Sequence, residues 1–250
     1  MKVSIIIPVY NEFRTLAQVL ERVRKAPIPE GYTREIIVVD DGSNDGTAHV
    51  LNEQAVAGIV IGHYSPVNRG KGAAIRTGIE LASGDVVLIQ DGDLEYDPAD
   101  YARILEPIAK GEADIVYGSR FTGRMTGMAL KNRIANAILT FAANLLFDAR
   151  ITDEATAYKA FRTSILRGMT LECRRFEFCP EVTAKVRRLG YTIHEAPIRY
   201  NARGIADGKK IRARDGFEAL WILVKYRFVP RSAFTHCVEA HGVISVGPVS

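Results

Sequence analysis

The 250-residue chain has only three cysteines, and their number and spacing argue against a disulfide-rich fold and against a zinc ribbon. Cys173, Cys179 and Cys237 are odd in number and show no Cys-x-x-Cys spacing. A disulfide framework and a zinc ribbon both need paired thiols, so neither is indicated. We expect a cytoplasmic protein whose thiols are reduced.

Long apolar runs are also missing. The longest nearly apolar run, residues 134–147, is shorter than the ~20 residues that a membrane-spanning helix needs. Pro8 comes too early for the apolar region of a secretory signal peptide. We therefore expect no spanning segment. If the protein works at a membrane, we expect peripheral contact with its cytoplasmic face.

Neither sign of charge is in large excess. The 33 Lys and Arg residues oppose 29 Asp and Glu residues, which leaves a formal charge of +4. This excess is too small to indicate a nucleic-acid partner, but it suits an anionic ligand or a membrane surface. With 47% hydrophobic residues, the chain can bury the core of one full domain.

Two common phosphate-binding motifs are absent. Residues 68–74, Asn-Arg-Gly-Lys-Gly-Ala-Ala, precede a helical pattern but match neither Gly-x-x-x-x-Gly-Lys-Ser/Thr nor Gly-x-Gly-x-x-Gly. P-loop nucleotidases and nicotinamide enzymes are therefore disfavoured. The segment could still approach a phosphate closely and supply the cation of Lys71.

Strand-like and helix-like segments alternate through the first half of the chain. Apolar, largely β-branched runs predict buried strands at residues 3–10, 35–41, 58–64, 86–91 and 113–119. Helical periodicity falls at residues 16–23, 71–82 and 97–109. We expect an α/β fold, a mostly parallel sheet flanked by helices, with ligands at the carboxyl ends of the strands.

Acidic residues stand where two of these strands end. Alternate residues of an extended chain point the same way, so Asp91 and Asp93 could share one Mg²⁺ or Mn²⁺ whose open positions take phosphate oxygens. Asp40 and Asp41 end another predicted strand and could hydrogen-bond a nucleoside. For each pair, a polar or capped turn after a buried strand is the plain alternative.

In combination, these segments resemble the inverting, metal-dependent nucleotide-sugar glycosyltransferases of the Rossmann-like GT-A fold. Within that group, they resemble the polyprenyl-phosphate (dolichyl-phosphate) mannose and glucose synthases. The matching segments, in order, are residues 8–12, 38–47, 68–74, 90–98, 117–121, 153–159, 176–181, 195–200, Arg203 and 208–211. The resemblance implies one GT-A domain over residues 1–228, with a nucleotide-binding half of about 1–120 and an acceptor half of about 121–228.

The resemblance also implies roles for individual residues. The nucleotide pocket would comprise Pro8, Tyr10, Glu12, Asp40, Asp41 and Lys71. The metal would be held by Asp91 and Asp93, with Glu95 where some relatives add a third polar ligand. The catalytic set would be Asp91, Asp93, Arg120 and Arg203.

Further cations would neutralise phosphate on the acceptor side. They are Lys131, Arg133, Lys209 and Lys210. The arginine and serine that relatives carry just before the central helix have no clear equivalents here, because residues 128–133 supply only Lys131 and Arg133. The long spacing from Arg203 to Gly208 leaves open which of the two later lysines meets phosphate.

The implied reaction is a single displacement with inversion that moves a hexose from GDP-mannose or a UDP-sugar to polyprenyl phosphate. A phosphate acceptor is already an anion, so no strong general base is needed. Gln-x-x-Arg-Trp, typical of processive polysaccharide synthases, is absent. A transferase to a hydroxyl acceptor in polysaccharide or glycolipid synthesis, and a nucleotide-sugar binding module without turnover, remain as alternatives.

The C-terminal part of the domain predicts an amphipathic helix. Its apolar residues recur at i, i+3, i+4, i+7 and i+11: Phe217, Leu220, Trp221, Val224 and Phe228. With Lys225, Arg227 and Arg231 nearby, the helix could lie in a membrane headgroup layer, or it could pack on its own core. A membrane-protein partner and a homo-oligomer both stay open for this chain. Residues 229–250 predict a mobile tail.

Overall fold

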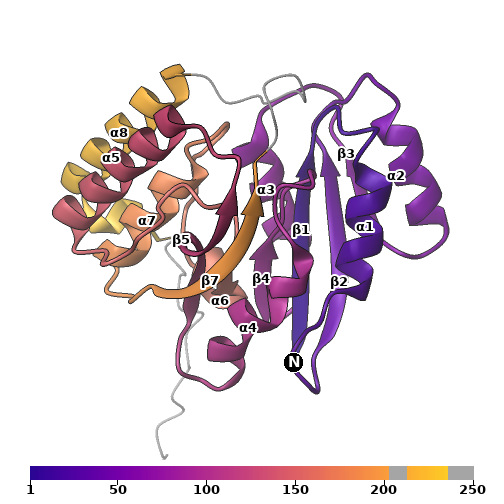
Figure 1. The fold of residues 1–250 in the computed structure, drawn as a ribbon, viewed down its shortest axis with the longest axis horizontal. Coiled ribbons are helices and arrows are strands. Elements are labelled where there is room, and N and C mark those ends of the chain that lie inside the picture. Colours follow the sequence, from indigo (N-terminus) through magenta and orange to yellow (C-terminus); the bar gives the residue numbers. More distant parts are fainter. Residues whose placement is uncertain (203–212, 236–250) are drawn as a thin grey trace, which may run out of the picture.

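The computed structural model describes residues 1–202 and 213–235, whose strands form one sheet. Its strand order is β3-β2-β1-β4-β6-β5-β7 (Figure 1). The strands are β1 (Lys2–Val9), β2 (Thr33–Asp40), β3 (Ile61–Tyr64), β4 (Val86–Ile89), β5 (Ile115–Thr126), β6 (Lys159–Arg162) and β7 (His194–Asn201).

The sheet is mostly parallel, as the sequence predicts. Strands β3, β2, β1 and β4 run parallel, β6 is antiparallel to its neighbours β4 and β5, and β7 is parallel to β5. Residues 3–9 of β1 and the whole of β4 are buried, which is why their sequences are apolar without alternation. β3 begins three residues later than predicted, because residues 57–60 form the turn that closes the preceding helix.

Helices cover both faces of the sheet. They are α1 (Leu16–Lys25), α2 (Thr47–Val56), α3 (Lys71–Leu81), α4 (Tyr101–Ala109), α5 (Leu130–Phe147), α6 (Thr163–Arg167), α7 (Phe178–Arg188) and α8 (Ala213–Phe228), with the 3₁₀ turns η1 (Pro98–Asp100) and η3 (Arg231–Ala233). One apolar cluster joins α1 and α4 to one face, and a second joins α3, α6 and α7 to the other.

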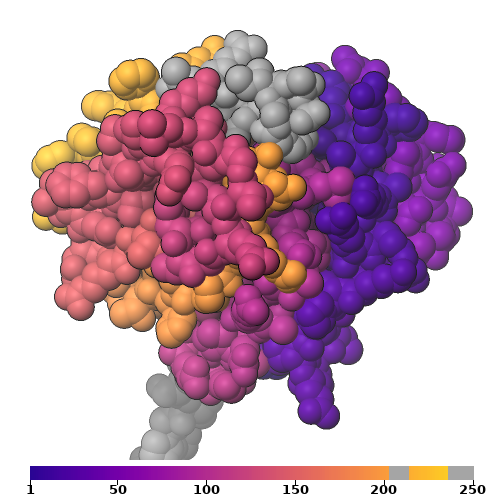
Figure 2. Space-filling model, in the orientation of Figure 1, coloured from indigo at the N-terminus to yellow at the C-terminus, as the bar shows by residue number. Residues whose placement is uncertain are grey.

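A third apolar cluster lies between α5, α7 and α8. Figure 2 shows α5 and α8 together on one flank, opposite the N-terminal strands and helices, which are indigo and violet. Within the two described ranges, no helix combines the length and the apolar character that crossing a membrane requires.

The expectation of a mobile tail from residue 229 is wrong for residues 229–235. Phe234 is fully buried, and its ring centroid lies 5.8 Å from that of Tyr226. The guanidinium of Arg188 lies 4.9 Å from the Phe234 ring, and Thr235 forms a β-bridge with Met169. An aromatic side chain gains enough from burial to fix this segment on α7 and α8. Residues 236–250 lie outside the described part of the chain.

Candidate active site

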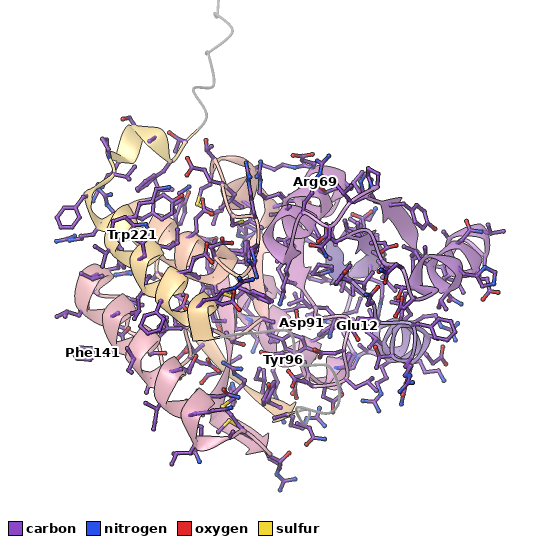
Figure 3. All side chains as sticks on the ribbon, turned by 90° about the horizontal axis from the view of Figure 1, so that it is seen from above. Glu12, Arg69, Asp91, Tyr96, Phe141 and Trp221 are labelled. Atoms are coloured by element: carbon purple, nitrogen blue, oxygen red, sulfur yellow. The ribbon has the colours of Figure 1, made fainter. Side chains whose placement is uncertain are left out.

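The polar segments that follow β1, β2 and β4 meet at one edge of the sheet. β1 lies between β2 and β4, so Val9 stands beside Asp40 on one side while Asp91 emerges on the other. Seen from above, Glu12 and Asp91 lie next to each other near the middle of the molecule (Figure 3). The sheet thus brings the predicted nucleotide-binding and metal-binding residues together.

The two acids after β2 are buried and already hydrogen-bonded within the chain. Asp40 Oδ1 accepts from the Ser43 amide (3.1 Å) and hydroxyl (2.5 Å). The Asp41 carboxylate accepts from the amides of Arg69 (2.8 Å) and Gly70 (2.6 Å). Burial raises the pKa of the Asp41 carboxyl, although the two amide donors act in the opposite direction. Asp41 therefore fastens the glycine-rich segment to the rim, and its contact with a nucleoside stays a prediction.

The segment after β1 is hydrogen-bonded to the segments that follow both neighbouring strands. The Glu12 amide donates to Thr47 Oγ1 (2.9 Å), at the start of α2. Thr15 Oγ1 contacts both Glu12 Oε2 (2.9 Å) and the Gly92 carbonyl (3.1 Å), beside the Asp91 turn. Pro8 is buried inside β1, whereas Tyr10 is half-buried at the rim. Of these predicted nucleotide-binding residues, Tyr10 and Glu12 lie in the loop at the rim.

The start of α3 does not form an open phosphate cradle. The amides of Gly72 and Ala73 donate to the carbonyls of Arg175 (2.7 Å) and Arg174 (2.8 Å). A Cβ added at Gly70, whose φ is +99°, would lie 2.5 Å from the Arg174 oxygen, so only glycine fits there. The chain itself therefore occupies these two amides, and the approach of the segment to a phosphate stays a prediction.

The cation of this segment lies on the predicted metal ligands. Lys71 Nζ forms an ion pair with Asp91 Oδ1, and both side chains are partly buried. Burial opposes the charge on Lys71, yet the nearby carboxylates of Asp91 and Asp93 outweigh it and raise the pKa of the ammonium group. Lys71 therefore sits where it can balance the charge of the carboxylate pair.

Asp93 and Glu95 are held in different ways. Asp93 is buried and its Oδ1 accepts from the Glu95 amide (3.0 Å), while Glu95 Oε2 accepts from the Tyr200 hydroxyl (2.8 Å). Across residues 1–202 and 213–235, no three His, Cys, Asp or Glu side chains converge on one point. In this structure Glu95 is therefore not gathered at one point with Asp91 and Asp93, and its role as a third metal ligand stays a prediction.

Asp91 and Asp93 nevertheless fit Mg²⁺ or Mn²⁺. Hard divalent ions prefer oxygen ligands, and Mg²⁺ is commonly held by one or two carboxylates together with substrate phosphates and waters. Two aspartates on one turn after a buried strand supply that donor set and leave coordination positions free. The metal role of the pair stays a prediction.

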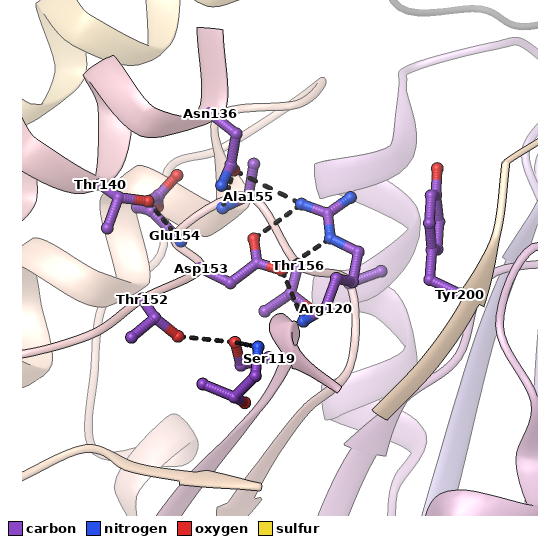
Figure 4. Close-up of polar contacts among 12 residues, drawn as sticks. Ser119, Arg120, Asn136, Thr140, Thr152, Asp153, Glu154, Ala155, Thr156 and Tyr200 are labelled. Atoms are coloured by element: carbon purple, nitrogen blue, oxygen red, sulfur yellow. Dashed lines mark hydrogen bonds and ion pairs between the residues drawn. The ribbon is translucent and has the colours of Figure 1, made fainter. Parts of the chain in front are cut away.

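Arg120, near the middle of β5, forms a buried ion pair with Asp153 (Figure 4). Its Nε and Nη2 donate to the two carboxylate oxygens of Asp153, each at 2.7 Å, and its backbone amide donates to the same group (3.0 Å). Although burial disfavours the charged guanidinium, Tyr96 and Asp153 raise the pKa of Arg120. This geometry fixes a permanent cation.

Tyr200 connects this cation to the carboxylate rim. The guanidinium of Arg120 lies 5.0 Å from the Tyr200 ring centroid, and the Tyr200 hydroxyl donates to Glu95 (2.8 Å). The Glu95 amide in turn donates to Asp93 (3.0 Å). A short chain of contacts therefore joins Arg120 to the predicted metal site.

The loop that carries Asp153 is held by α5 and β7. Asn136 Oδ1 accepts from Arg120 Nη2 (3.4 Å) and from the Ala155 amide (3.2 Å). Thr140 Oγ1 accepts from the Glu154 amide (3.1 Å), as Figure 4 shows. Among the described residues, three buried polar atoms nearby have no hydrogen-bond partner: Asn136 Nδ2, Glu154 Oε2 and Thr156 Oγ1.

Sequence reasoning gave no role to several residues that build this site. Gln90 is fully buried, its Oε1 accepts from the hydroxyls of Tyr101 (2.6 Å) and Tyr158 (2.7 Å), and its Nε2 donates to the Asp91 carbonyl (2.8 Å). Asp153 belongs to a segment that matched the family, which was the available signal. No local pattern identifies Asn136.

The remaining predicted phosphate-binding residues are not gathered in the described site. Lys131 and Arg133 lie in the first turn of α5 and are exposed, five and three residues before Asn136. Arg203, Lys209 and Lys210 lie outside the described residues. Their roles stay predictions.

Comparison with known proteins places the chain among sugar transferases. The model of the family described as Glycosyl transferase family 2 matches residues 4–169, more than half of the chain. An undecaprenyl-phosphate mannosyltransferase of Micrococcus luteus is 31% identical over 219 residues, which cover 84% of this chain and 87% of that protein. The UDP-N-acetylglucosamine–dolichyl-phosphate N-acetylglucosaminyltransferase of Methanococcus voltae is 28% identical over 244 residues, which cover 89% and 94%.

Solved structures confirm the predicted GT-A fold. Glucosyl-3-phosphoglycerate synthase of Mycobacterium tuberculosis, crystallised with Mn²⁺, UDP and phosphoglyceric acid, superposes with a TM-score of 0.68 at 20% sequence identity. The match covers 92% of this chain and 79% of that one. With the carboxylate rim, the mostly parallel sheet and the family match in agreement, the chain belongs to glycosyl transferase family 2.

Proposed function

We propose that this enzyme transfers a hexose from a nucleotide-sugar to the phosphate of a polyprenyl phosphate. The observation that carries the proposal is the buried, bidentate Arg120–Asp153 pair, which fixes a cation beside the carboxylate rim. A phosphate acceptor is an anion, so a fixed guanidinium beside the rim suits it better than a neutral hydroxyl acceptor. Two relatives named for undecaprenyl-phosphate and dolichyl-phosphate acceptors support the same class of substrate.

The reaction follows from the charges. A phosphate oxygen of the acceptor attacks the anomeric carbon, the bond from that carbon to the diphosphate oxygen breaks, and the nucleoside diphosphate leaves with the bonding electrons. The acceptor is an anion at neutral pH, so no side chain has to remove a proton. Arg120 orients the phosphate and reduces the repulsion between two anions. A Mg²⁺ or Mn²⁺ ion held by Asp91 and Asp93 would stabilise charge on the leaving diphosphate.

We assign the donor nucleoside to the polar segments that follow β1 and β2. Tyr10 and Glu12 lie in the loop after β1, beside the turn of Asp40 and Asp41. We assign the donor to these residues and the acceptor phosphate to Arg120. GDP-mannose and UDP-sugars are both compatible with these residues.

The acceptor is a lipid, so the enzyme must meet a membrane surface. α8 presents an apolar outer face in which Phe217 is 75% exposed, Trp221 64% and Phe228 80%. Arg227 and Arg231 are exposed nearby. Aromatic residues with neighbouring cations suit the headgroup layer, which supports peripheral membrane binding.

A transfer panel tests the function. Labelled GDP-mannose, UDP-glucose and UDP-N-acetylglucosamine are each incubated with polyprenyl phosphate and Mn²⁺ or Mg²⁺. We expect one donor to label the lipid in a product that mild acid cleaves. Label in an acid-stable and alkali-stable glycoside of a hydroxyl acceptor would replace this proposal with a hydroxyl transferase.

A further inference from the structure

The outer face of α5 exposes a long apolar stripe. The exposed fractions are 71% for Leu130, 52% for Ile134, 50% for Ile138, 66% for Phe141 and 71% for Leu145. Residues spaced three or four apart lie on one side of a helix, so these five form one stripe along its length. Single exposed apolar side chains are ordinary, but a contiguous row of five marks an interaction surface.

The stripe continues onto α8. The two helices pack against each other through buried residues that include Leu139 and Leu223. Figure 3 places Phe141 and Trp221 on the same flank of the molecule, away from Asp91 and Glu12. We call this surface the α5–α8 face: Leu130, Ile134, Ile138, Phe141, Leu145, Phe217, Trp221, Val224 and Phe228.

The charges around the α5–α8 face favour an anionic lipid surface. Residues 130–147 contain no acidic residue, and the exposed Asp148 that follows them is paired with Arg150 (3.0 Å). On α8, Asp215 is buried and Glu218 half-buried. A second copy packed on the same face would bring like charges together. A bilayer instead gives the apolar residues acyl chains and the cations lipid phosphates. The exposed cations on the two helices and just after them include Lys131, Arg133, Arg227 and Arg231.

The inner face of α5 builds the Arg120 site. Asn136, 5% exposed, lies between Ile134 and Ile138 in sequence but on the opposite side of the helix. It contacts Arg120 Nη2 and the Ala155 amide, and Thr140, one turn on, holds the Glu154 amide. One helix thus carries the apolar stripe on one side and part of the support of Arg120 on the other.

We propose that α5 is a lipid-docking helix, with the stripe inserted in the headgroup layer of an anionic bilayer and Asn136 acting as a positioning residue for Arg120. This arrangement brings the phosphate-binding cation to the membrane surface, where a lipid phosphate is presented. The docking surface stands without the proposed acceptor, whereas the role of Asn136 rests on that proposed function.

Vesicle co-sedimentation tests the docking surface. The full chain is mixed with vesicles of phosphatidylcholine containing about one third phosphatidylglycerol, and with pure phosphatidylcholine vesicles. We expect binding that depends on the anionic lipid and that falls at least tenfold in the double variant Ile134→Ser/Phe141→Ser. The matched control is Val56→Ser/Ile61→Ser, which alters two exposed apolar residues elsewhere (82% and 44% exposed) and should bind like wild type. Thermal melting establishes that both variants are folded.

Equal vesicle binding by wild type and the stripe variant would overturn the proposal. So would a wild-type dimer in solution that the stripe variant dissociates, with no vesicle binding, because the face would then join two copies. If neither a vesicle-embedded nor a short-chain soluble polyprenyl phosphate accepts sugar while vesicle binding persists, the proposed function fails and the docking surface stands.

Activity separates the two sides of α5. The stripe variant should lose activity on the vesicle-embedded acceptor and keep it on the short-chain acceptor without vesicles. Asn136→Ala should bind vesicles normally and raise the KM for both acceptors about tenfold at unchanged nucleotide affinity. Asn136→Asp, which retains an acceptor oxygen for Arg120, should recover most of that loss. An unchanged acceptor KM in Asn136→Ala would contradict the positioning role.

Discussion

The ammonium of Lys71 forms an ion pair with the carboxylate of Asp91, so a cation of the chain itself lies on one of the two predicted metal ligands. Two neighbouring carboxylates repel each other, and a positive charge lowers that cost. A bound metal would supply the same charge, and the donor phosphates would then offer Lys71 a new partner. Lys71 therefore links the occupancy of the Asp91–Asp93 pair, by metal or by its own ammonium group, to the glycine-rich segment that Asp41 holds.

Lys71→Met should change metal and nucleotide binding in opposite directions. In the absence of nucleotide, Mn²⁺ should bind roughly tenfold more tightly, because its competitor for Asp91 is gone. Nucleoside diphosphate should bind more weakly to the metal-loaded variant. Calorimetric titration measures both affinities, and Lys110→Met, which removes a surface lysine paired with Glu106 (2.7 Å), is the matched control. Unchanged Mn²⁺ affinity in Lys71→Met would show that the ion pair does not govern the site.

Nucleoside diphosphate binding should depend on a divalent ion and on Asp93. EDTA should strongly weaken the binding of nucleoside diphosphate to the wild-type protein. Asp93→Ala should bind the nucleotide weakly with or without EDTA. Its melting temperature should stay within a few degrees of the wild-type value. Transfer activity should be lost in the variant. Equal nucleotide affinity with and without EDTA, together with an active Asp93→Ala, would rule out the metal site.

Breaking the pair between Arg120 and Asp153 should harm stability as well as activity. Asp153→Ala leaves a buried guanidinium without its partner, and we expect a loss of about 3–5 kcal/mol in the free energy of unfolding. Arg120→Met/Asp153→Ala removes both charges and should recover part of that loss while transfer remains abolished. Chemical denaturation supplies these values. If Asp153→Ala lowered the free energy of unfolding by less than about 1 kcal/mol, the Arg120–Asp153 pair would not be needed for the stability of the fold.

Glu154 should make the chain less stable as pH rises. Burial raises the pKa of this carboxyl to about 7, with Lys159 acting in the opposite direction. Between about pH 4.5 and 7, the carboxyl is protonated in the folded state and ionised in the unfolded state. The free energy of unfolding therefore falls as pH rises through this window, by up to roughly 3 kcal/mol in total. Glu154→Gln, which mimics the neutral acid, should raise the melting temperature at pH 8 and much less at pH 5. An equal effect at both pH values would exclude an ionised wild-type side chain at pH 8.

Sequence reasoning predicted the sheet and its rim because those features are local. Buried parallel strands are continuous apolar runs, and acidic residues directly after such strands must lie at the edge of the sheet where the strands end. The partners of these acids were not predictable. Asp41 accepts from amides 28 and 29 residues away, and Arg120 meets Asp153 33 residues later in the chain. Such contacts depend on tertiary folding, which no local spacing encodes.

The apolar run of α5 shows a second limit. Residues 134–147 are apolar on nearly all sides, so their periodicity does not distinguish the buried Leu139 and Ala143 from the exposed Phe141 and Leu145. Only packing against α7 and α8 decides which side faces inward. Phe234 was misassigned for the same reason, since a lone aromatic residue in an aperiodic segment carries no signal of burial.

The identity of the acceptor atom is the most direct test of the account. ³¹P NMR of a short-chain polyprenyl phosphate, incubated with the enzyme, Mn²⁺-free Mg²⁺ buffer and the preferred nucleotide-sugar, distinguishes a phosphomonoester from a phosphodiester. We predict that the monoester resonance of the lipid is replaced by a diester resonance as nucleoside diphosphate appears, and that Arg120→Ala slows this conversion at least a hundredfold. Release of nucleoside diphosphate with the lipid monoester unchanged would contradict transfer to polyprenyl phosphate.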